Sequence, residues 1–184
     1  PVPPMSKDEE FTRAMALAYF DYLRKSWSGG FVVSLSGGAD SAAVSCLARV
    51  MLDLALAELG EVRLRARLPH LNLPEETKDW MKTLLFCAYQ GTKNSGDVTR
   101  NAARAVAEAI GCDYAEWEVD QFVEGYESTI ESVIGRSLSW EQDDITRQNI
   151  QARVRAPGIW MMANIRNSLL PVSYTHLTLP TNCV

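Results

Sequence analysis

A short apolar run that stops at two glycines and resumes as a helix constrains this chain more than any other feature. Residues 31–35 read Phe-Val-Val-Ser-Leu and follow turn residues, which predicts a buried strand. Ser36-Gly37-Gly38 interrupts the run, and residues 40–59 are nearly all apolar. They predict a helix that is buried over most of its surface and ends at Gly60. A strand, a glycine loop and a helix in this order are typical of an α/β domain that binds a ligand beyond the carboxyl end of the strand.

Further strands and helices alternate along the chain and support this fold class. The sequence predicts strands at residues 84–89 and 114–119, and helices at residues 8–26, 99–110, 122–134 and 144–156. The last of these helices is expected to break at Pro157-Gly158. Residues 62–68 alternate between apolar and charged side chains, which predicts an exposed strand or extended segment. Together the elements predict a parallel sheet flanked by helices.

Composition excludes several classes of protein. The chain has 184 residues, 47% of them hydrophobic, which suits one domain with a substantial core. Its net charge of -5 argues against a nucleic-acid partner, because such proteins usually carry a basic surface. No apolar stretch of about 18 residues predicts a transmembrane helix, and the first eleven residues lack the pattern of a signal peptide. We therefore expect neither a nucleic-acid nor a membrane partner.

The cysteines indicate a reducing compartment. The four cysteines form no CxxC pair and only two histidines are present, so a structural zinc site is not expected. Cys46 and Cys87 lie in apolar runs and are predicted to be buried. A cytoplasmic location follows as the simplest expectation.

The loop between the first strand and its helix has the chemistry of an anion site. Two glycines let backbone N–H groups approach an anion, and the helix start adds free N–H donors and a positive dipole end. Ser36 and Ser41 add hydroxyl donors. Asp40 would repel a bare phosphate, so we expect a Mg²⁺ ion between this carboxylate and the phosphate oxygens. The alternative is a simple glycine turn in which Asp40 caps the helix.

The hexapeptide Ser36-Gly37-Gly38-Ala39-Asp40-Ser41 resembles the pyrophosphate-binding loop of the N-type ATP pyrophosphatases. This group includes NAD synthetases, GMP synthetases, asparagine synthetases and tRNA-thiolating enzymes, which adenylate a substrate oxygen and release pyrophosphate. The resemblance implies an adenine nucleotide alpha hydrolase-like (Rossmann-like) α/β fold, here expected to be incomplete at its C-terminus.

Two further segments resemble the glutamine-dependent NAD synthetases. Residues 89–95, followed by Thr99-Arg100, resemble the segment that runs along the adenosine side of ATP in that family. Taken alone, this segment is equally an ordinary polar loop. The resemblance implies that ATP is bound by Ser34, Ser36, Gly37, Gly38, Asp40, Ser41, Thr92 and Asn94, with Asp40 as the catalytic residue and metal ligand.

The second segment, residues 148–155, matches the family's Asn-x-x-Ala-Arg-x-Arg helix, which helps to hold deamido-NAD. Asn149 and Arg153 are four residues apart and share one face of a helix. Arg155 lies about 200° further round, so a regular helix cannot direct both arginines into one pocket. We expect Asn149 and Arg153 to bind substrate and Arg155 to form a structural ion pair. The alternative for each arginine is a solvated or salt-bridged side chain.

The resemblance predicts ATP-dependent amidation of deamido-NAD to NAD, with ATP and Mg²⁺ as cofactors. Ammonia would come from glutamine through an N-terminal glutaminase domain, and a homo-oligomer is expected. Residues 1–170 are assigned to a partial synthetase domain. Residues 171–184 resemble a translated sequencing adapter and are expected to be a non-native tail. Because the resemblance to the family stops at Leu170, before the next expected strand with its nucleotide- and metal-binding residues, we expect the chain alone to be inactive. The alternatives are another adenylating enzyme, such as one for tRNA thiolation, or a nucleotide-binding module without catalysis.

Overall fold

A computed structural model describes residues 5–172 of the chain. Its elements run in the order α1 (Lys7–Ser26), β1 (Phe31–Ser34), α2 (Ala39–Arg67), a 3-10 turn (Thr77–Asp79), α3 (Trp80–Leu84), β2 (Leu85–Gly91), α4 (Asp97–Ile110), β3 (Asp113–Glu118), α5 (Asp120–Ile134), α6 (Asp144–Arg153) and α7 (Arg155–Ile165). Most of the expected tail lies outside the described residues.

The three strands form one parallel sheet in the order β1-β2-β3. Every residue of β2 is buried, because β2 is paired on both sides and covered on both faces. Residues 167–169 run beside the free edge of β1, where the Val32 amide donates to the Leu169 carbonyl at 2.8 Å. The observed architecture confirms the predicted α/β class with a parallel sheet.

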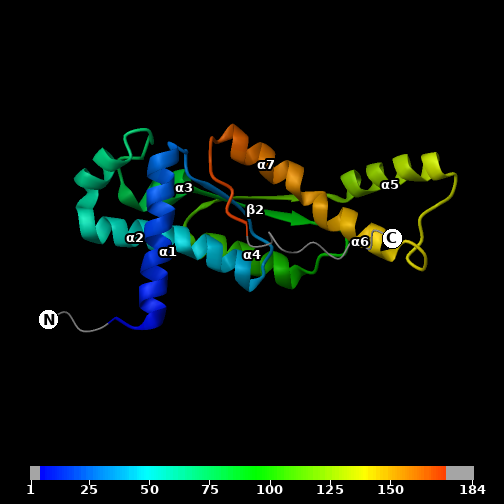
Figure 1. Cartoon of the computed structure of the whole chain (residues 1–184), viewed down its shortest axis with the longest axis horizontal. Helices are drawn as coiled ribbons and strands as arrows, with labels where there is room; N and C mark the ends of the chain where they lie inside the picture. The colour runs from blue at the N-terminus through cyan, green and yellow to red at the C-terminus, as the bar shows by residue number, and fades with distance from the viewer. Residues whose placement is uncertain (1–4, 173–184) are drawn as a thin grey trace.

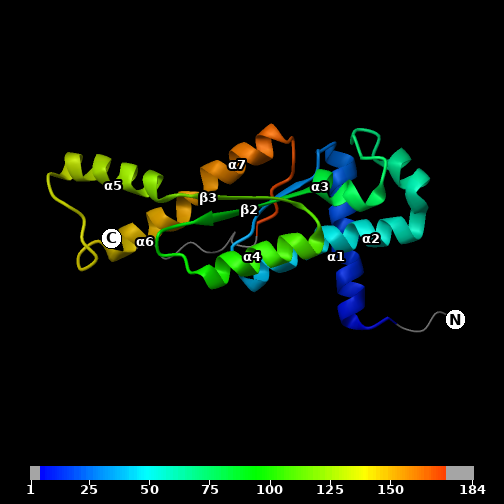
Figure 2. The ribbon, with the colours of Figure 1, turned by 180° about the vertical axis from the view of Figure 1, so that it is seen from behind.

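Helices cover both faces of the sheet (Figure 1). On one face α2 and α4 pack in the larger core, with α1 against α2. On the other face α7 places Ile159 and Ala163 against Val32, Phe86 and Ala88. Figure 2 shows the same layers from behind, with α5 and α6 lying beyond the carboxyl ends of the strands. The loops that leave the carboxyl ends of the three strands therefore lie at one edge of the sheet.

The segment around Gly60 differs from the prediction. The chain leaves the helical conformation at Gly60, with φ 69° and ψ 165°, but resumes a helix as far as Arg67. The predicted strand at residues 62–68 is therefore wrong. Leu64 and Leu68 are four residues apart and both are buried, so the helical spacing prevails over the alternating pattern. The Arg65 guanidinium holds this helical segment against the chain that follows it, because it donates to the Leu73 carbonyl at 3.0 Å and stacks on Trp80.

The helical hydrogen-bond pattern is interrupted between α6 and α7 at Val154, whose φ and ψ stay helical at -60° and -18°. Pro157, three residues further along the chain, causes this interruption. Pro157 has no N–H to donate to the carbonyl of Arg153, and its ring clashes with that carbonyl. Pro157 itself sits in the first turn of α7, where a missing N–H costs little. The expected break at Pro157-Gly158 is therefore displaced toward the N-terminus, and it separates Arg153 from Arg155.

Candidate functional site

The loop after β1 curls around one buried hydroxyl. Ser41 Oγ accepts a hydrogen bond from the Ser36 amide at 3.2 Å and donates to the Gly38 carbonyl at 3.0 Å. Gly38 is the N-cap of α2 and supplies no side-chain cap, so the first-turn N–H groups lack a capping side chain. Uncapped N–H groups at the positive end of a helix dipole form an anion site.

Gly37 sets the shape of this loop through its backbone. Its φ is +81°, and a Cβ atom there would lie 2.2 Å from the Thr99 carbonyl oxygen in the first turn of α4. Only glycine accepts that conformation and that approach without strain. The loop after β1 is thereby packed against the helix that follows β2. Tyr89 of β2 strengthens this contact, since its hydroxyl lies 3.0 Å from Thr99 Oγ1.

Asp40 lies inside the first turn of α2, two residues beyond the N-cap. The interpretation of Asp40 as the helix cap is therefore wrong. Its carboxylate is exposed and makes no hydrogen bond or ion pair with any of residues 5–172. Within the same residues no group of three or more His, Cys, Asp or Glu side chains gathers around a metal position. A cation held here would take one protein carboxylate and complete its shell with phosphate oxygens and water, as Mg²⁺ often does.

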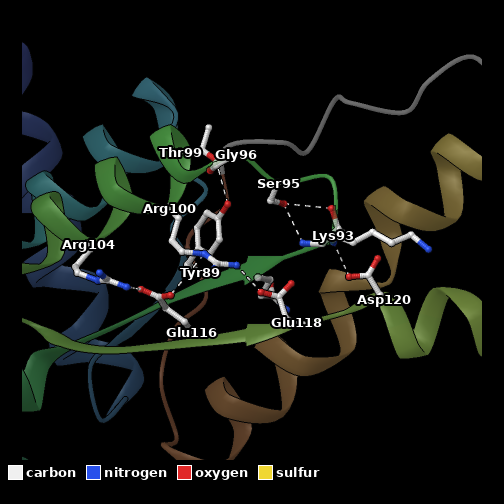
Figure 3. Close-up of polar contacts among 12 residues, drawn as sticks. Tyr89, Lys93, Ser95, Gly96, Thr99, Arg100, Arg104, Glu116, Glu118 and Asp120 are labelled. Atoms are coloured by element: carbon white, nitrogen blue, oxygen red, sulfur yellow. Dashed lines mark hydrogen bonds and ion pairs between the residues drawn. The ribbon is translucent and has the colours of Figure 1, made fainter.

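The turn after β2 lies at the same edge of the sheet. The Thr92 amide donates to Ser95 Oγ at 2.9 Å, and the Lys93 amide donates to Asp120 Oδ2 at 2.7 Å (Figure 3). Asn94 is exposed, and its side chain has no hydrogen bond within the described part of the chain. The parallel register therefore brings Thr92 and Asn94 to the same edge as the loop after β1. Their role in binding ATP stays a prediction.

A set of ion pairs beside this turn was not predicted from the sequence. Arg100 of α4 pairs with Glu118 of β3, and Arg104 Nη2 pairs with Glu116 Oε1 at 2.7 Å (Figure 3). Burial opposes the ionisation of Glu116 and is the largest single influence, but the hydrogen bond from Arg104 and the charges of Arg104 and Arg100 together outweigh it and lower the pKa of this carboxyl. The pattern was present in the sequence, because the glutamates are two apart on a strand and the arginines four apart on a helix.

Gln90 joins the ends of two strands to α7. It is buried, its Oε1 accepts from Ser34 Oγ at 3.2 Å, and its Nε2 donates to the Arg155 carbonyl at 2.7 Å. Arg155 Nε returns a hydrogen bond to the Gln90 carbonyl at 3.1 Å. Arg155 has no carboxylate partner among residues 5–172, so the expected ion pair is wrong although the structural role is as expected. Burial lowers the pKa of this guanidinium from its ordinary value.

Asn149 and Arg153 share a face of α6, as their spacing predicts. The Arg153 guanidinium donates to the Asn149 side-chain oxygen, and Arg153 is exposed. The backbone stays helical through Val154, so Arg155 lies about 200° further round than Arg153 and contacts β2, and the two arginines face different surroundings. A role for Asn149 and Arg153 in binding substrate stays a prediction.

Comparison with known proteins identifies the family. A family model described as NAD synthase matches residues 12–176, which is most of the chain. The chain belongs to the NAD synthase family. A glutamine-dependent NAD(+) synthetase of Oryza sativa subsp. indica is 30% identical over 172 residues, which cover 86% of this chain and 23% of that protein. The solved structure of a glutamine-dependent NAD(+) synthetase from Cytophaga hutchinsonii is 46% identical, with a TM-score of 0.84, over 90% of this chain and 30% of that one.

The NAD synthase fold extends to more distant structures. The glutamine-dependent NAD+ synthetase of Acinetobacter baumannii, solved with adenosine diphosphate, superposes with a TM-score of 0.67 at 20% identity over 92% of this chain and 26% of that one. The family and fold predicted from the motifs are thus confirmed. The chain spans about a quarter of the length of the curated relatives it matches. None of the helices among residues 5–172 combines the length and apolar character needed to cross a bilayer.

Proposed function

We propose that this chain forms part of a ligase that converts deamido-NAD to NAD at the expense of ATP. The observation that carries the proposal is the uncapped start of α2 behind Gly37-Gly38, with the unpaired Asp40 carboxylate in its first turn. The names of its relatives, several of them glutamine-dependent NAD(+) synthetases, support the same activity for the protein to which this chain belongs.

In the proposed reaction the loop after β1 receives the phosphates of ATP. The backbone N–H groups of the first turn of α2 donate to phosphate oxygens, with Ser36 beside them. Asp40 would hold Mg²⁺, and this ion would supply positive charge beside the phosphate oxygens. Ser34, Thr92 and Asn94 line the nucleoside side of the same edge.

The chemistry proceeds in two displacements. An oxygen of the nicotinate carboxylate of deamido-NAD attacks the α-phosphorus of ATP, and the bond to the pyrophosphate breaks. Ammonia then attacks the acyl carbon, the bond to AMP breaks, and NAD forms after the nitrogen loses a proton. Asn149 and Arg153 hold the dinucleotide during both steps. Fixed donors at the positions where charge develops supply the main stabilisation of each transition state.

The cellular setting extends this proposal. Ammonia is supplied from glutamine by a glutaminase domain, in keeping with the glutamine-dependent names of the relatives. We further propose a cytoplasmic location, a homo-oligomer, and the assignment of residues 1–170 to the synthetase domain and residues 171–184 to a non-native tail. The family match extends to residue 176, so the boundary at residue 170 stays a prediction.

Two measurements test the function. The first is calorimetric titration of this chain with ATP and Mg²⁺ and, separately, with deamido-NAD. The second replaces the corresponding segment of the Cytophaga hutchinsonii enzyme with residues 5–172 and measures pyrophosphate release from ATP. Release that depends on deamido-NAD and ammonia supports the proposal. Release that depends on tRNA would instead identify a different adenylating enzyme, and ATP binding without release in the chimera would indicate a binding module.

A further inference from the structure

Gln90 occupies an unusual position at the edge of the sheet that carries the candidate site. It lies in β2, with β1 on one side and β3 on the other, and only 5% of its surface is exposed. Both ends of its side-chain amide are used, by Ser34 Oγ at 3.2 Å and by the Arg155 carbonyl at 2.7 Å. A buried amide with both ends satisfied fixes the relative position of the groups that it joins.

The two partners of Gln90 belong to the two halves of the candidate site. Ser34 is the last residue of β1, and the chain passes from it directly into the phosphate-binding loop. Arg155 is the first residue of α7, two residues after Arg153. The Gln90 side chain therefore contacts both β1, which leads to the proposed ATP site, and the α6–α7 junction, which follows the proposed deamido-NAD site.

The start of α7 packs closely against Gln90 and Trp117, so a displacement of one would move the other. A Cβ atom at Gly158 would lie 3.4 Å from Gln90 Nε2 and 3.4 Å from Trp117 Cζ2, so the helix backbone lies directly against both side chains. Arg155 Nε also donates to the Gln90 carbonyl at 3.1 Å, which is a second hydrogen bond between the α6–α7 junction and β2. The hydrogen bonding between α6 and α7 is interrupted near Val154, although φ and ψ there stay helical at -60° and -18°, so these contacts add to the backbone in holding the α6–α7 junction against β2.

We infer that Gln90 is a positioning residue that couples the two ligand sites. It fixes the α6–α7 junction relative to the end of β1. Binding of ATP and binding of deamido-NAD therefore favour each other. The inference rests on the proposed function. Gln90 is too deeply buried to act as a ligand-contacting group itself. An apolar residue of similar size would fill the same volume but would leave the Ser34 hydroxyl and the Arg155 carbonyl without this partner.

The test compares the affinity of this chain for deamido-NAD with and without saturating α,β-methylene-ATP and Mg²⁺. The ratio of the two dissociation constants is the coupling factor, which by linkage is the same whichever ligand is added first. For the unaltered chain we expect a factor of at least about five. In Gln90→Leu we expect the factor to fall below about two, while the affinity for each ligand alone changes less than about threefold.

Two further variants keep the result interpretable. Gln90→Met has an unbranched side chain of similar size and removes the same two side-chain hydrogen bonds, so it should lower the coupling factor in the same way, and it decides whether the inference holds if Gln90→Leu does not fold. Tyr114→Phe is the matched control. It removes another buried side-chain oxygen of the sheet, one without a hydrogen-bond partner among the described residues, and should leave the factor unchanged.

Hydrogen exchange supplies a readout that needs no ligand. In Gln90→Leu the amides of α6 and the first turn of α7 should exchange at least tenfold faster, while those of α2 stay unchanged. A coupling factor near one in the unaltered chain, or an undiminished factor in Gln90→Leu, would overturn the inference and leave the proposed function standing. Failure of the unaltered chain to bind either ligand would overturn the proposed function and the inference with it.

Discussion

Substitution by alanine should destabilise the protein much more at Gly37 than at Gly38, the two adjacent glycines of the loop after β1. Gly37 has a φ of +81°, and an added Cβ would lie 2.2 Å from the carbonyl oxygen of Thr99. Gly38 has a φ of -91°, and the nearest atom to an added Cβ would be Ser36 Oγ at 3.4 Å. The second position therefore accepts alanine with little change in the backbone, whereas the first does not.

The expected cost follows from this geometry. To restore ordinary contact at Gly37, the loop and the first turn of α4 must separate by about 1.2 Å, which is the difference between 3.4 and 2.2 Å. A residue forced into the left-handed region costs about 1–3 kcal/mol, and overpacking a close contact adds about 1–3 kcal/mol. Gly37→Ala should therefore lower the free energy of unfolding by about 2–6 kcal/mol, and Gly38→Ala by less than about 1 kcal/mol.

Urea unfolding followed by tryptophan fluorescence measures both free energies of unfolding. ATP titration of the folded variants measures the affinity of the loop after β1 for ATP. A shift of about 1 Å in a positioned group is enough to weaken binding strongly, so Gly37→Ala should also lose ATP affinity at temperatures where it stays folded. Equal stability of the two variants, within about 0.5 kcal/mol, would refute the assignment of Gly37 to a strained close approach.

Three further outcomes are expected. Asp40→Asn should weaken ATP binding at least about tenfold in the presence of Mg²⁺ and much less in its absence, with the free energy of unfolding unchanged within about 0.5 kcal/mol, as paired titrations and urea unfolding would reveal. Arg153→Ala should weaken binding of deamido-NAD more than that of ATP, whereas Arg155→Ala should mainly lower stability, by about 1.5–3 kcal/mol; equal losses for both ligands in Arg153→Ala would contradict the split. Hydrogen bonds from Arg136 lower the pKa of Asp143 to about 2, so the stability it contributes is present above its ordinary unfolded pKa and disappears as the pH falls toward 2; unfolding curves of Asp143→Asn should lack this part of the acid dependence.

Features encoded by neighbouring residues were predictable from the sequence. The strand, the glycine loop and the helix of residues 31–59 lie where the apolar pattern places them. At the start of the predicted helix of residues 8–26, Ser6 accepts a hydrogen bond from the Glu9 amide at 3.2 Å, a contact between residues three apart. Asn149 and Arg153 contact each other because four residues make just over one helical turn.

Features that depend on a distant partner were not predictable in this way. Within the predicted helix at residues 122–134, apolar side chains recur at helical spacing, at Phe122, Tyr126, Ile130 and Val133. All four are exposed, because α5 lies beyond the sheet and buries Val123 instead. Cys46 is likewise exposed, contrary to expectation, whereas Cys87 is buried as predicted. An apolar stripe defines a face, but the packing of the other elements decides whether that face is covered.

The partners of Arg155 and Gln90 were decided by the tertiary structure. Arg155 was expected to find a carboxylate, but its face of the helix packs against β2, where it donates to the carbonyl of Gln90, 65 residues away in the chain. Gln90 itself carries no sequence signal, since its importance arises only when β1, β2 and α7 meet. Local patterns specify strands, loops and helix faces because they act through bonds and turns of a few residues. The groups joined across the sheet edge are specified only by the folded arrangement that makes their burial and hydrogen bonding mutually consistent.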